Sequence, residues 1–305
     1  MFPVLLAIDG FSLSSFGVFL AAGFIFGVFL VWRLSRAWDL NEEKVLDLTL
    51  LTFLGGLVTS RIYFALEHWQ FFFPNILNLI LVLKNPGFSF WGGFLGGWLS
   101  LYFFARKFRI DFWQVADIAA VGFLGGLIFA QIGCFLGGCD IGIVQKGFLS
   151  VSMVGAIGSR FPIQIFEAAV LFLILRKIWA KATHFHQRGQ IISLTLISIG
   201  IVKLLALPWK ERAQLEFIFP LILLILGIII FYKMQPTRTP LSDFKNLGKF
   251  VWGLFSNGEV REKVVINIKK SWYNQRVNLV WKVKSLIKLL RRLNVRSSPK
   301  NTANY

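Results

Sequence analysis

The sequence has few charged residues for its length. Only 16% of its 305 residues are Asp, Glu, Lys or Arg, and 56% are apolar, whereas about a quarter of the residues in a typical soluble domain are charged. Mean hydropathy is +0.65. Several apolar runs approach the roughly 20 residues that cross a bilayer as a helix. This scarcity of charge argues against a soluble domain and predicts an all-α polytopic membrane protein.

Cysteine and histidine are also scarce. The two cysteines, Cys134 and Cys139, are too few for a disulfide framework or for a metal site, so we expect no metal and no cofactor. Small apolar packing is the favoured role of each cysteine, and a disulfide on an oxidising outer face is the alternative. His68 follows an apolar run, where an interfacial side chain beside Trp69 is favoured over a general base.

Seven apolar ranges predict membrane-spanning helices. They cover residues 13–32, 46–66, 88–104, 113–136, 163–180, 190–207 and 216–233. The apolar run 71–83 is shorter and contains Pro74, so we interpret it as a re-entrant or interfacial segment. The glycine-spaced stretch 126–142 is interpreted as a loop at the end of the fourth span. We expect no cleavable signal peptide, because no basic segment precedes the first span.

Lys and Arg concentrate in alternate loops. One set of loops holds Arg33, Arg36, Lys44, Arg106, Lys107, Arg109, Arg176, Lys177, Lys181 and Arg188. The opposite set holds only Lys84, Lys146, Arg160, Lys210 and Arg212. Because the loops rich in Lys and Arg stay in the cytoplasm, the N-terminus is predicted outside and the C-terminus inside.

A basic tail follows the last predicted span. From Lys233 onward there are 16 Lys and Arg but only three acidic residues. Residues 240–293 mix large apolar side chains with Lys and Arg at roughly helical spacing, a pattern that can lie on an anionic membrane face. We therefore predict two domains, a transmembrane domain over 1–235 and a membrane-surface tail over 236–305, with 297–305 disordered. A nucleic-acid arm is the less favoured alternative, and we expect no nucleic-acid partner.

Four ionisable residues lie within the predicted spans: Arg61, Asp117, Glu167 and Lys203. Charged groups are costly in a bilayer and are functional candidates by default, although two acids and two bases could instead pair to hold the bundle together. Arg160 and Gln164 lie at the start of the fifth span. Together with Arg61 and Lys203 they could clamp an anionic headgroup, because guanidinium groups match phosphate oxygens well.

Four segments, taken in order, resemble the bacterial prolipoprotein diacylglyceryl transferases. They are TSRIYFAL, FWGGFLGG, FWQVADIAA followed by AQIGCFLGGCDIG, and RFPIQIFEAAVLFLIL. The resemblance covers roughly residues 10–235. It implies a multi-pass enzyme of the bacterial inner membrane that moves a diacylglyceryl group from phosphatidylglycerol, or a similar anionic phospholipid, to a cysteine thiol. That cysteine lies in the lipobox of a lipoprotein precursor's signal peptide, and glycerol phosphate is released.

The resemblance also implies a set of site residues. The candidate catalytic residues are Lys203, Glu167 and Asp117. The candidate substrate-binding residues are Arg61, Gln131, Gly138, Cys139, Gly142, Arg160 and Gln164. The chain departs from the family at Trp91, which takes the place of a histidine and cannot accept a proton, and at Gln131, which takes the place of an arginine.

These departures leave alternatives open. A catalytically degenerate family member would keep the cavity and bind lipid or the lipoprotein signal without turnover. A small-molecule transporter or flippase is less favoured, because such proteins often contain paired internal repeats and none is evident in this sequence.

Overall fold

The computed structural model describes residues 4–8, 11–72, 77–80, 87–147, 149–153, 155–211, 217–236 and 238–296. The expected disorder of 297–305 and most of the run 71–83 lie outside these residues. The chain divides into two compact units, Met1–Pro236 and Thr237–Tyr305, which are described separately here.

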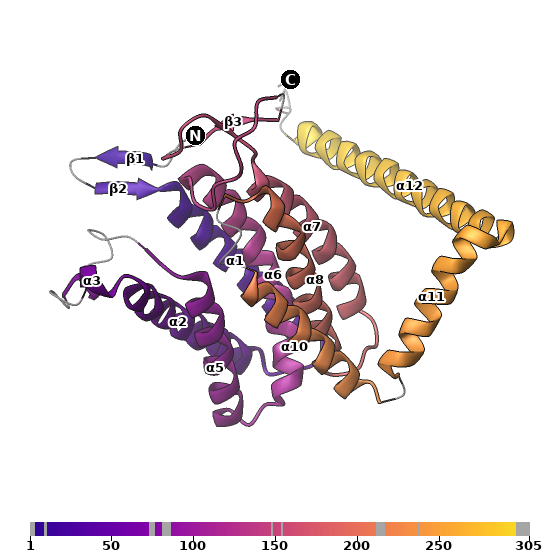
Figure 1. Cartoon of the computed structure of the whole chain (residues 1–305), viewed down its shortest axis with the longest axis horizontal. Helices are drawn as coiled ribbons and strands as arrows, with labels where there is room; N and C mark the ends of the chain where they lie inside the picture. The colour runs from indigo at the N-terminus through magenta and orange to yellow at the C-terminus, as the bar shows by residue number, and fades with distance from the viewer. Residues whose placement is uncertain are drawn as a thin grey trace, which may run out of the picture. The chain divides into compact units, whose positions relative to one another are not determined.

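Helices occupy all seven ranges predicted to span the membrane. In the first unit they are α1 (Ser15–Ala37), α2 (Glu42–Glu67), α5 (Phe90–Lys107), α6 (Phe112–Gly137), α7 (Ile163–Ala182), α8 (Gln190–Ala206) and α10 (Ile218–Met234) (Figure 1). By length and composition, α1, α2, α6 and α8 with the following turn η1 (Leu207–Trp209) can cross a bilayer. The fold is therefore that of an all-α multi-pass membrane protein, and crossing by the other three helices stays a prediction.

Side-chain caps set where several of these helices begin. The Asn41 side chain accepts a hydrogen bond from the Lys44 amide at 2.9 Å before α2, and Asp111 accepts one from the Gln114 amide at 2.9 Å before α6. Such caps satisfy amides that have no partner in the first helical turn. The end of α6 is set by Gly138, whose φ of 79° is left-handed and favours glycine.

Short elements that the sequence analysis did not anticipate flank the helices. The strands β1 (Val4–Ile8) and β2 (Phe11–Ser14) form one antiparallel pair, and β3 (Val151–Ser152) and β4 (Ser159–Arg160) form another. The intervening Asp-Gly pair in the first case is a common hairpin signal. Within the run 71–83, the described residues include parts of two one-turn helices, α3 (Trp69–Phe72) and α4 (Leu77–Ile80).

Glycines allow close contacts between helices. Helix α1 packs against α6, and α2 against α5 (Figure 1). A Cβ atom added to Gly23 would lie 2.8 Å from the Gly126 oxygen, and one added to Gly27 would lie 2.9 Å from the Gly122 oxygen. Backbones approach this closely only where neither helix has a side chain between them.

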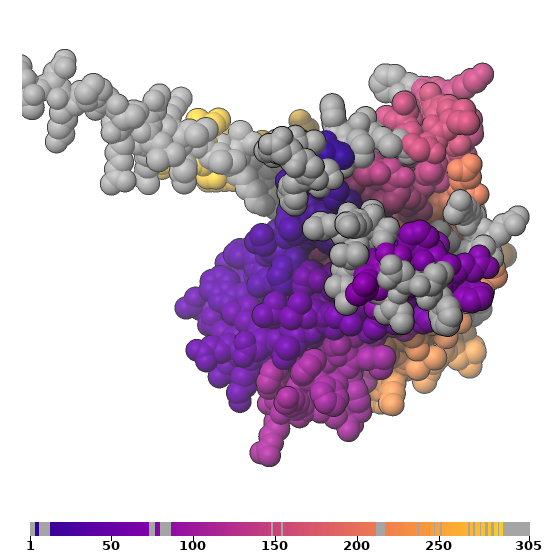
Figure 2. All heavy atoms as spheres, turned by 90° about the vertical axis from the view of Figure 1, so that its left-hand side faces the viewer, coloured from indigo at the N-terminus to yellow at the C-terminus, as the bar shows by residue number. Residues whose placement is uncertain are grey.

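Helix α6 forms the centre of the first unit, because it contacts α1, α7 and α8 and its side chains are mostly buried. The outer helices are different. Figure 2 shows the side of the unit formed by α1, α2 and α5. On α1 and α2, large apolar side chains such as Ile25, Leu54, Val58 and Leu66 are exposed. An apolar outer surface around a packed core is what a bilayer requires of the helices within it.

The second unit consists of two helices, α11 (Pro240–Ser256) and α12 (Gly258–Arg296). The helical periodicity predicted for residues 240–293 is therefore confirmed. A single residue, Asn257, separates the two helices, and its side chain accepts a hydrogen bond from the Glu259 amide at 3.1 Å.

The close approach of α1 and α6 predicts that Gly27→Val destabilises the protein. The added side chain must displace the α6 backbone, and overpacking of this kind costs about 1–3 kcal/mol. The thermal unfolding midpoint in detergent measures the effect. Gly147→Ala is the control, because a Cβ atom there meets no atom of the described residues within 4 Å. Equal midpoints for the two variants would contradict the packing argument.

Candidate functional site

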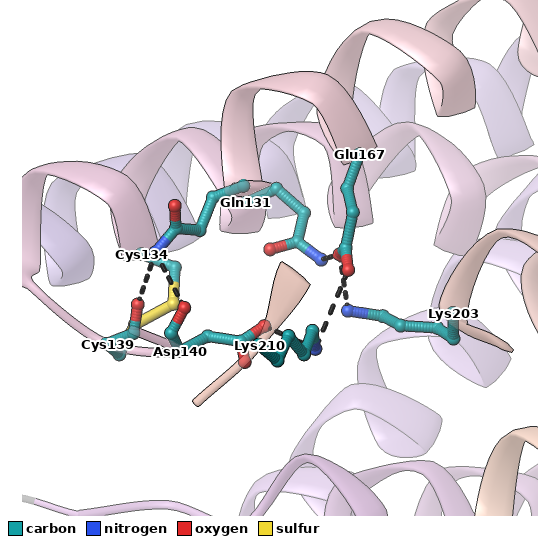
Figure 3. Close-up of a disulfide and its surroundings, with 8 residues drawn as sticks. Gln131, Cys134, Cys139, Asp140, Glu167, Lys203 and Lys210 are labelled. Atoms are coloured by element: carbon teal, nitrogen blue, oxygen red, sulfur yellow. Dashed lines mark hydrogen bonds and ion pairs between the residues drawn. A yellow bond between two sulfur atoms is a disulfide. The ribbon is translucent and has the colours of Figure 1, made fainter. Parts of the chain in front are cut away.

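The ends of three helices meet at one end of the bundle. Gln131 lies near the C-terminus of α6, Glu167 lies near the N-terminus of α7, and Lys203 lies in the last turn of α8. Successive helices that run antiparallel bring these ends together although the residues are far apart in the sequence. Figure 3 shows the three side chains pointing toward one another.

The Glu167 carboxylate is the centre of this group. Its Oε2 atom lies 2.6 Å from Lys203 Nζ and also accepts a hydrogen bond from Gln131 Nε2. Its Oε1 atom lies 3.5 Å from Lys210 Nζ. The Glu167 side chain is only 1% exposed, and burying a charge is tolerated when it is paired and hydrogen-bonded.

Lys210 joins a second carboxylate to the first. Its Nζ atom lies 2.7 Å from Asp140 Oδ2, and its side chain is 5% exposed. Sequence reasoning missed both Lys210 and Asp140. Helical spacing gave no signal, because α8 ends at Ala206 and Lys210 follows the turn η1 with extended backbone. We name Gln131, Asp140, Glu167, Lys203 and Lys210 the charged cluster (Figure 3).

Two backbone segments, at Trp209–Lys210 and at Phe161, hold the loop that carries Asp140. The Ile143 amide donates to the Trp209 oxygen at 2.9 Å, and the Phe161 amide donates to the Ile143 oxygen at 3.1 Å. Gly142 pairs with Lys210 in an antiparallel bridge. A Cβ atom on Gly142 would overlap the Phe161 carbonyl, so this predicted site residue fixes the path of the loop.

A disulfide joins Cys134 to Cys139 (Figure 3). The prediction that these cysteines serve as small apolar packing residues is therefore wrong, and the alternative, a disulfide, is what the structure contains. The physical reason is that α6 continues to Gly137, so most of the stretch 126–142 is helix, and the left-handed Gly138 turns the chain back on itself. This turn places the Cα atoms of Cys134 and Cys139 5.0 Å apart, within disulfide reach.

Gln164 holds the same loop from α7. Its Nε2 atom donates to the backbone oxygens of Cys139 at 2.7 Å and Asp140 at 2.9 Å. Its Oε1 atom is buried and accepts no hydrogen bond from the described residues. Among the predicted binding residues, Cys139 and Gln164 therefore shape the loop together.

Arg160 forms a separate charged group beside the loop. Its NH1 atom lies 3.1 Å from Glu211 Oε1 and 3.3 Å from the Gly142 oxygen, while Nε donates to the Ile157 oxygen at 3.3 Å. Glu211 was also missed from sequence. These contacts hold Arg160 against the loop. The sequence analysis had grouped it with Lys203 as part of a clamp for an anionic headgroup, and the two side chains have different partners here.

Asp117 and Arg61 make their hydrogen bonds to other parts of the chain than the charged cluster. Asp117 is fully buried and accepts the amides of Gly189 and Ile192, each at 2.7 Å, so it caps the start of α8. Because it precedes Gln131 by 14 residues on one helix, the two are separated by about 21 Å. Arg61 donates to the oxygens of Asn78 (2.8 Å), Leu79 (3.0 Å) and Gly87 (2.8 Å), and so fastens short segments to α2.

Trp91 and His68, the residues discussed in connection with a histidine base, have structural contacts. The Trp91 ring stacks on Phe219, with centroids 4.6 Å apart, and so connects α5 to α10. His68 ends α2, where its Nδ1 atom lies 3.0 Å from the Phe64 oxygen. Across the described part of the chain, no three His, Cys, Asp or Glu side chains gather as metal ligands.

Comparisons with known proteins agree on one family. The family model described as "Prolipoprotein diacylglyceryl transferase" matches residues 3–233. The phosphatidylglycerol–prolipoprotein diacylglyceryl transferase of Deinococcus radiodurans is 36% identical over 46% of this chain and 42% of its own length, so this alignment spans less than half of that relative. Proteins of the same name from Clostridium tetani and Dehalococcoides mccartyi are 23% and 26% identical over 76% of this chain and 97% and 94% of their own lengths.

The charged cluster predicts that Glu167→Ala strongly destabilises the protein. The change removes the acceptor shared by Lys203, Lys210 and Gln131, and breaking a buried ion pair costs about 3–5 kcal/mol. Thermal unfolding in detergent is the measurement. The control is Arg188→Ala, which removes an exposed pair with Asp111 and should cost about 1 kcal/mol or less. A loss at Glu167 no larger than the control's would show that the cluster contributes little to stability.

Proposed function

Because this chain belongs to the prolipoprotein diacylglyceryl transferase family, we propose that it transfers a diacylglyceryl group from phosphatidylglycerol to the thiol of a lipobox cysteine in a lipoprotein precursor. Two relatives whose printed names carry this activity, from Clostridium tetani and Dehalococcoides mccartyi, align along nearly their whole length. The single structural observation that supports the proposal is a pair of lysines, Lys210 buried and Lys203 partly exposed, around the buried Glu167 at one end of a bundle with an apolar outer surface.

The reaction requires an acceptor for the thiol proton and hydrogen-bond donors for the leaving phosphate. The sulfur of the substrate cysteine forms a bond to the glycerol carbon, and the bond from that carbon to the phosphate oxygen breaks. The thiol loses its proton, and glycerol phosphate leaves with an additional negative charge. A site for this chemistry must therefore offer fixed hydrogen-bond donors where charge develops on the phosphate.

We assign this role to Lys203 and Lys210. A lysine ammonium carries three donors, so Lys203 can keep its bond to Glu167 and still donate to a phosphate oxygen. With 13% of its side chain exposed, compared with 5% for Lys210 and 1% for Glu167, Lys203 is the most accessible of the three. Glu167 is then a positioning residue that holds both ammonium groups, and Gln131 orients Glu167.

The remaining predicted residues support this site indirectly. Gly138, Cys139, Gly142 and Gln164 shape the loop that delivers Asp140 to Lys210. We propose that Asp117 and Arg61 stabilise the bundle. No enzyme base is assigned, because Trp91 cannot accept a proton; the thiol proton passes to water.

A second candidate function is lipid binding without turnover. The observation in its favour is that two lysines and two carboxylates balance within the charged cluster, while Gln131 adds no charge. Such a site would hold a phosphodiester but give less help to a leaving phosphate. A transfer assay separates the two functions.

The assay gives the purified protein phosphatidylglycerol and a lipobox peptide, and detects the diacylglyceryl thioether by mass. We expect product from the unaltered chain and a loss of about 100-fold or more from Lys203→Met, because one donor to a developing anion is commonly worth that much. Arg188→Ala should keep full activity. Full transfer by Lys203→Met would remove Lys203 from the site, and bound lipid with no product from the unaltered chain would favour the second function.

We propose that the chain resides in the bacterial inner membrane as seven spans, with its N-terminus outside. The unequal distribution of Lys and Arg between alternate loops supports this orientation. It would place the disulfide on the outer face, where oxidised cysteines persist.

This topology predicts the result of labelling with a thiol reagent that cannot cross membranes. In intact cells, Val144→Cys should react and Arg106→Cys should not, whereas both should react after the membrane is permeabilised. The native Cys134 and Cys139 are oxidised and give no background signal. If only Arg106→Cys were labelled in intact cells, the N-terminus would lie inside and the predicted orientation would be wrong.

A further inference from the structure

The second unit, Thr237–Tyr305, presents apolar and basic side chains that the proposed reaction does not use. Helix α12 alone contains 11 Lys and Arg but only two Glu. Trp252 and Phe255 on α11 are 74% and 81% exposed, which is unusual for large apolar side chains in contact with water. Both features require an explanation.

Most exposed apolar side chains of α11 lie on one side of the helix. Leu241, Trp252 and Phe255 are all exposed, and at 100° per residue they fall within an arc of about 60°. The exposed Phe250 is the exception, because it falls about 180° from Leu241. Lys245 and Lys249 fall at one border of this arc, and Asp243 falls on the opposite side of the helix. A helix with an apolar side bordered by lysines is suited to the boundary between lipid headgroups and acyl chains.

Helix α12 supplies most of the charge. Its exposed apolar residues spread over about half of the helix circumference, and Lys269 and Arg276 lie among them. They are Val265, Ile266, Trp272, Tyr273, Val280, Trp281 and Ile287. The Arg276 guanidinium lies 5.5 Å from the centre of the Trp272 ring. Long basic side chains of this kind cover apolar surface with their stems while their charged ends reach phosphate groups.

From these observations we infer that α11 and α12 bind the anionic headgroup surface of a bilayer, with α11 inserting its apolar side and α12 contributing mainly electrostatic attraction. Each Lys or Arg near an anionic surface adds to the attraction, and the unit's acidic residues number only three. A nucleic-acid arm shares the positive charge, but it does not explain an arc of exposed aliphatic and aromatic side chains on α11. Anionic phospholipid is therefore the partner.

The test uses the full chain in lipid nanodiscs, with one environment-sensitive fluorophore attached to an introduced cysteine. Phe255→Cys marks the apolar side of α11, and Asn246→Cys, nine residues earlier and about 180° around the helix, is the matched control. The native cysteines are joined to each other, so only the introduced thiol is labelled. Quenching by lipids that carry a spin label on the acyl chain reports insertion.

We expect strong quenching at position 255 and little at 246 in nanodiscs that contain about 30% phosphatidylglycerol, and much weaker quenching at 255 in pure phosphatidylcholine. A variant with Lys269, Lys270, Lys284 and Lys288 all changed to Gln should need about threefold more anionic lipid to reach half of the maximal quenching. Added salt should act in the same direction as this variant.

Three outcomes would overturn the inference. Equal quenching at both positions would show that α11 has no inserted side. Quenching at 255 that is the same in phosphatidylcholine would show that the charges do not matter. Fluorescence that is unchanged by either lipid but changes on addition of a short RNA at physiological salt would identify the unit as a nucleic-acid arm.

Discussion

The arrangement of the first unit depends on one buried carboxylate, that of Glu167. It lies where α6 and α8 end and α7 begins, and each of its contacts comes from another part of the chain: Gln131 from α6, Lys203 from α8 and Lys210 from the segment after η1. A charge in this position is stable only while all its partners remain in place. The need to keep the Glu167 carboxylate paired therefore sets the register of α6, α7, α8 and the following segment, and the same pairing forms the candidate site.

The loop around the cluster is constrained from several directions for the same reason. The disulfide closes the end of α6, Gln164 holds the carbonyls of Cys139 and Asp140, and Arg160 holds that of Gly142. Without these restraints Asp140 would not be held 2.7 Å from Lys210. At the other end of the bundle, Asp117 performs a comparable function by capping α8. Glu167 and Asp117 are both buried acids within apolar runs. They have different roles because lysines face Glu167 and backbone amides face Asp117.

The helices could be predicted well, and the site only in part. Long apolar runs leave little choice of secondary structure in a bilayer, so all seven ranges were located within a few residues. Glu167 and Lys203 stood out because charge is rare in such runs. Asp140 and Lys210 did not, because they lie in a loop where charge is ordinary and only the fold brings them together. The same holds for the disulfide, since the left-handed turn at Gly138 that joins its two cysteines has no unambiguous signal in the sequence.

The charged cluster holds two ammonium groups and two carboxylates, and such a balanced set projects almost no field beyond its own contacts. Long-range steering, which speeds the encounter of oppositely charged partners in solution, therefore contributes little to substrate arrival. A lipid donor instead arrives by lateral diffusion within the bilayer, a search confined to two dimensions. Ionic strength should then leave the encounter rate almost unchanged, and the membrane's lipid composition becomes the variable that sets how often the site is visited.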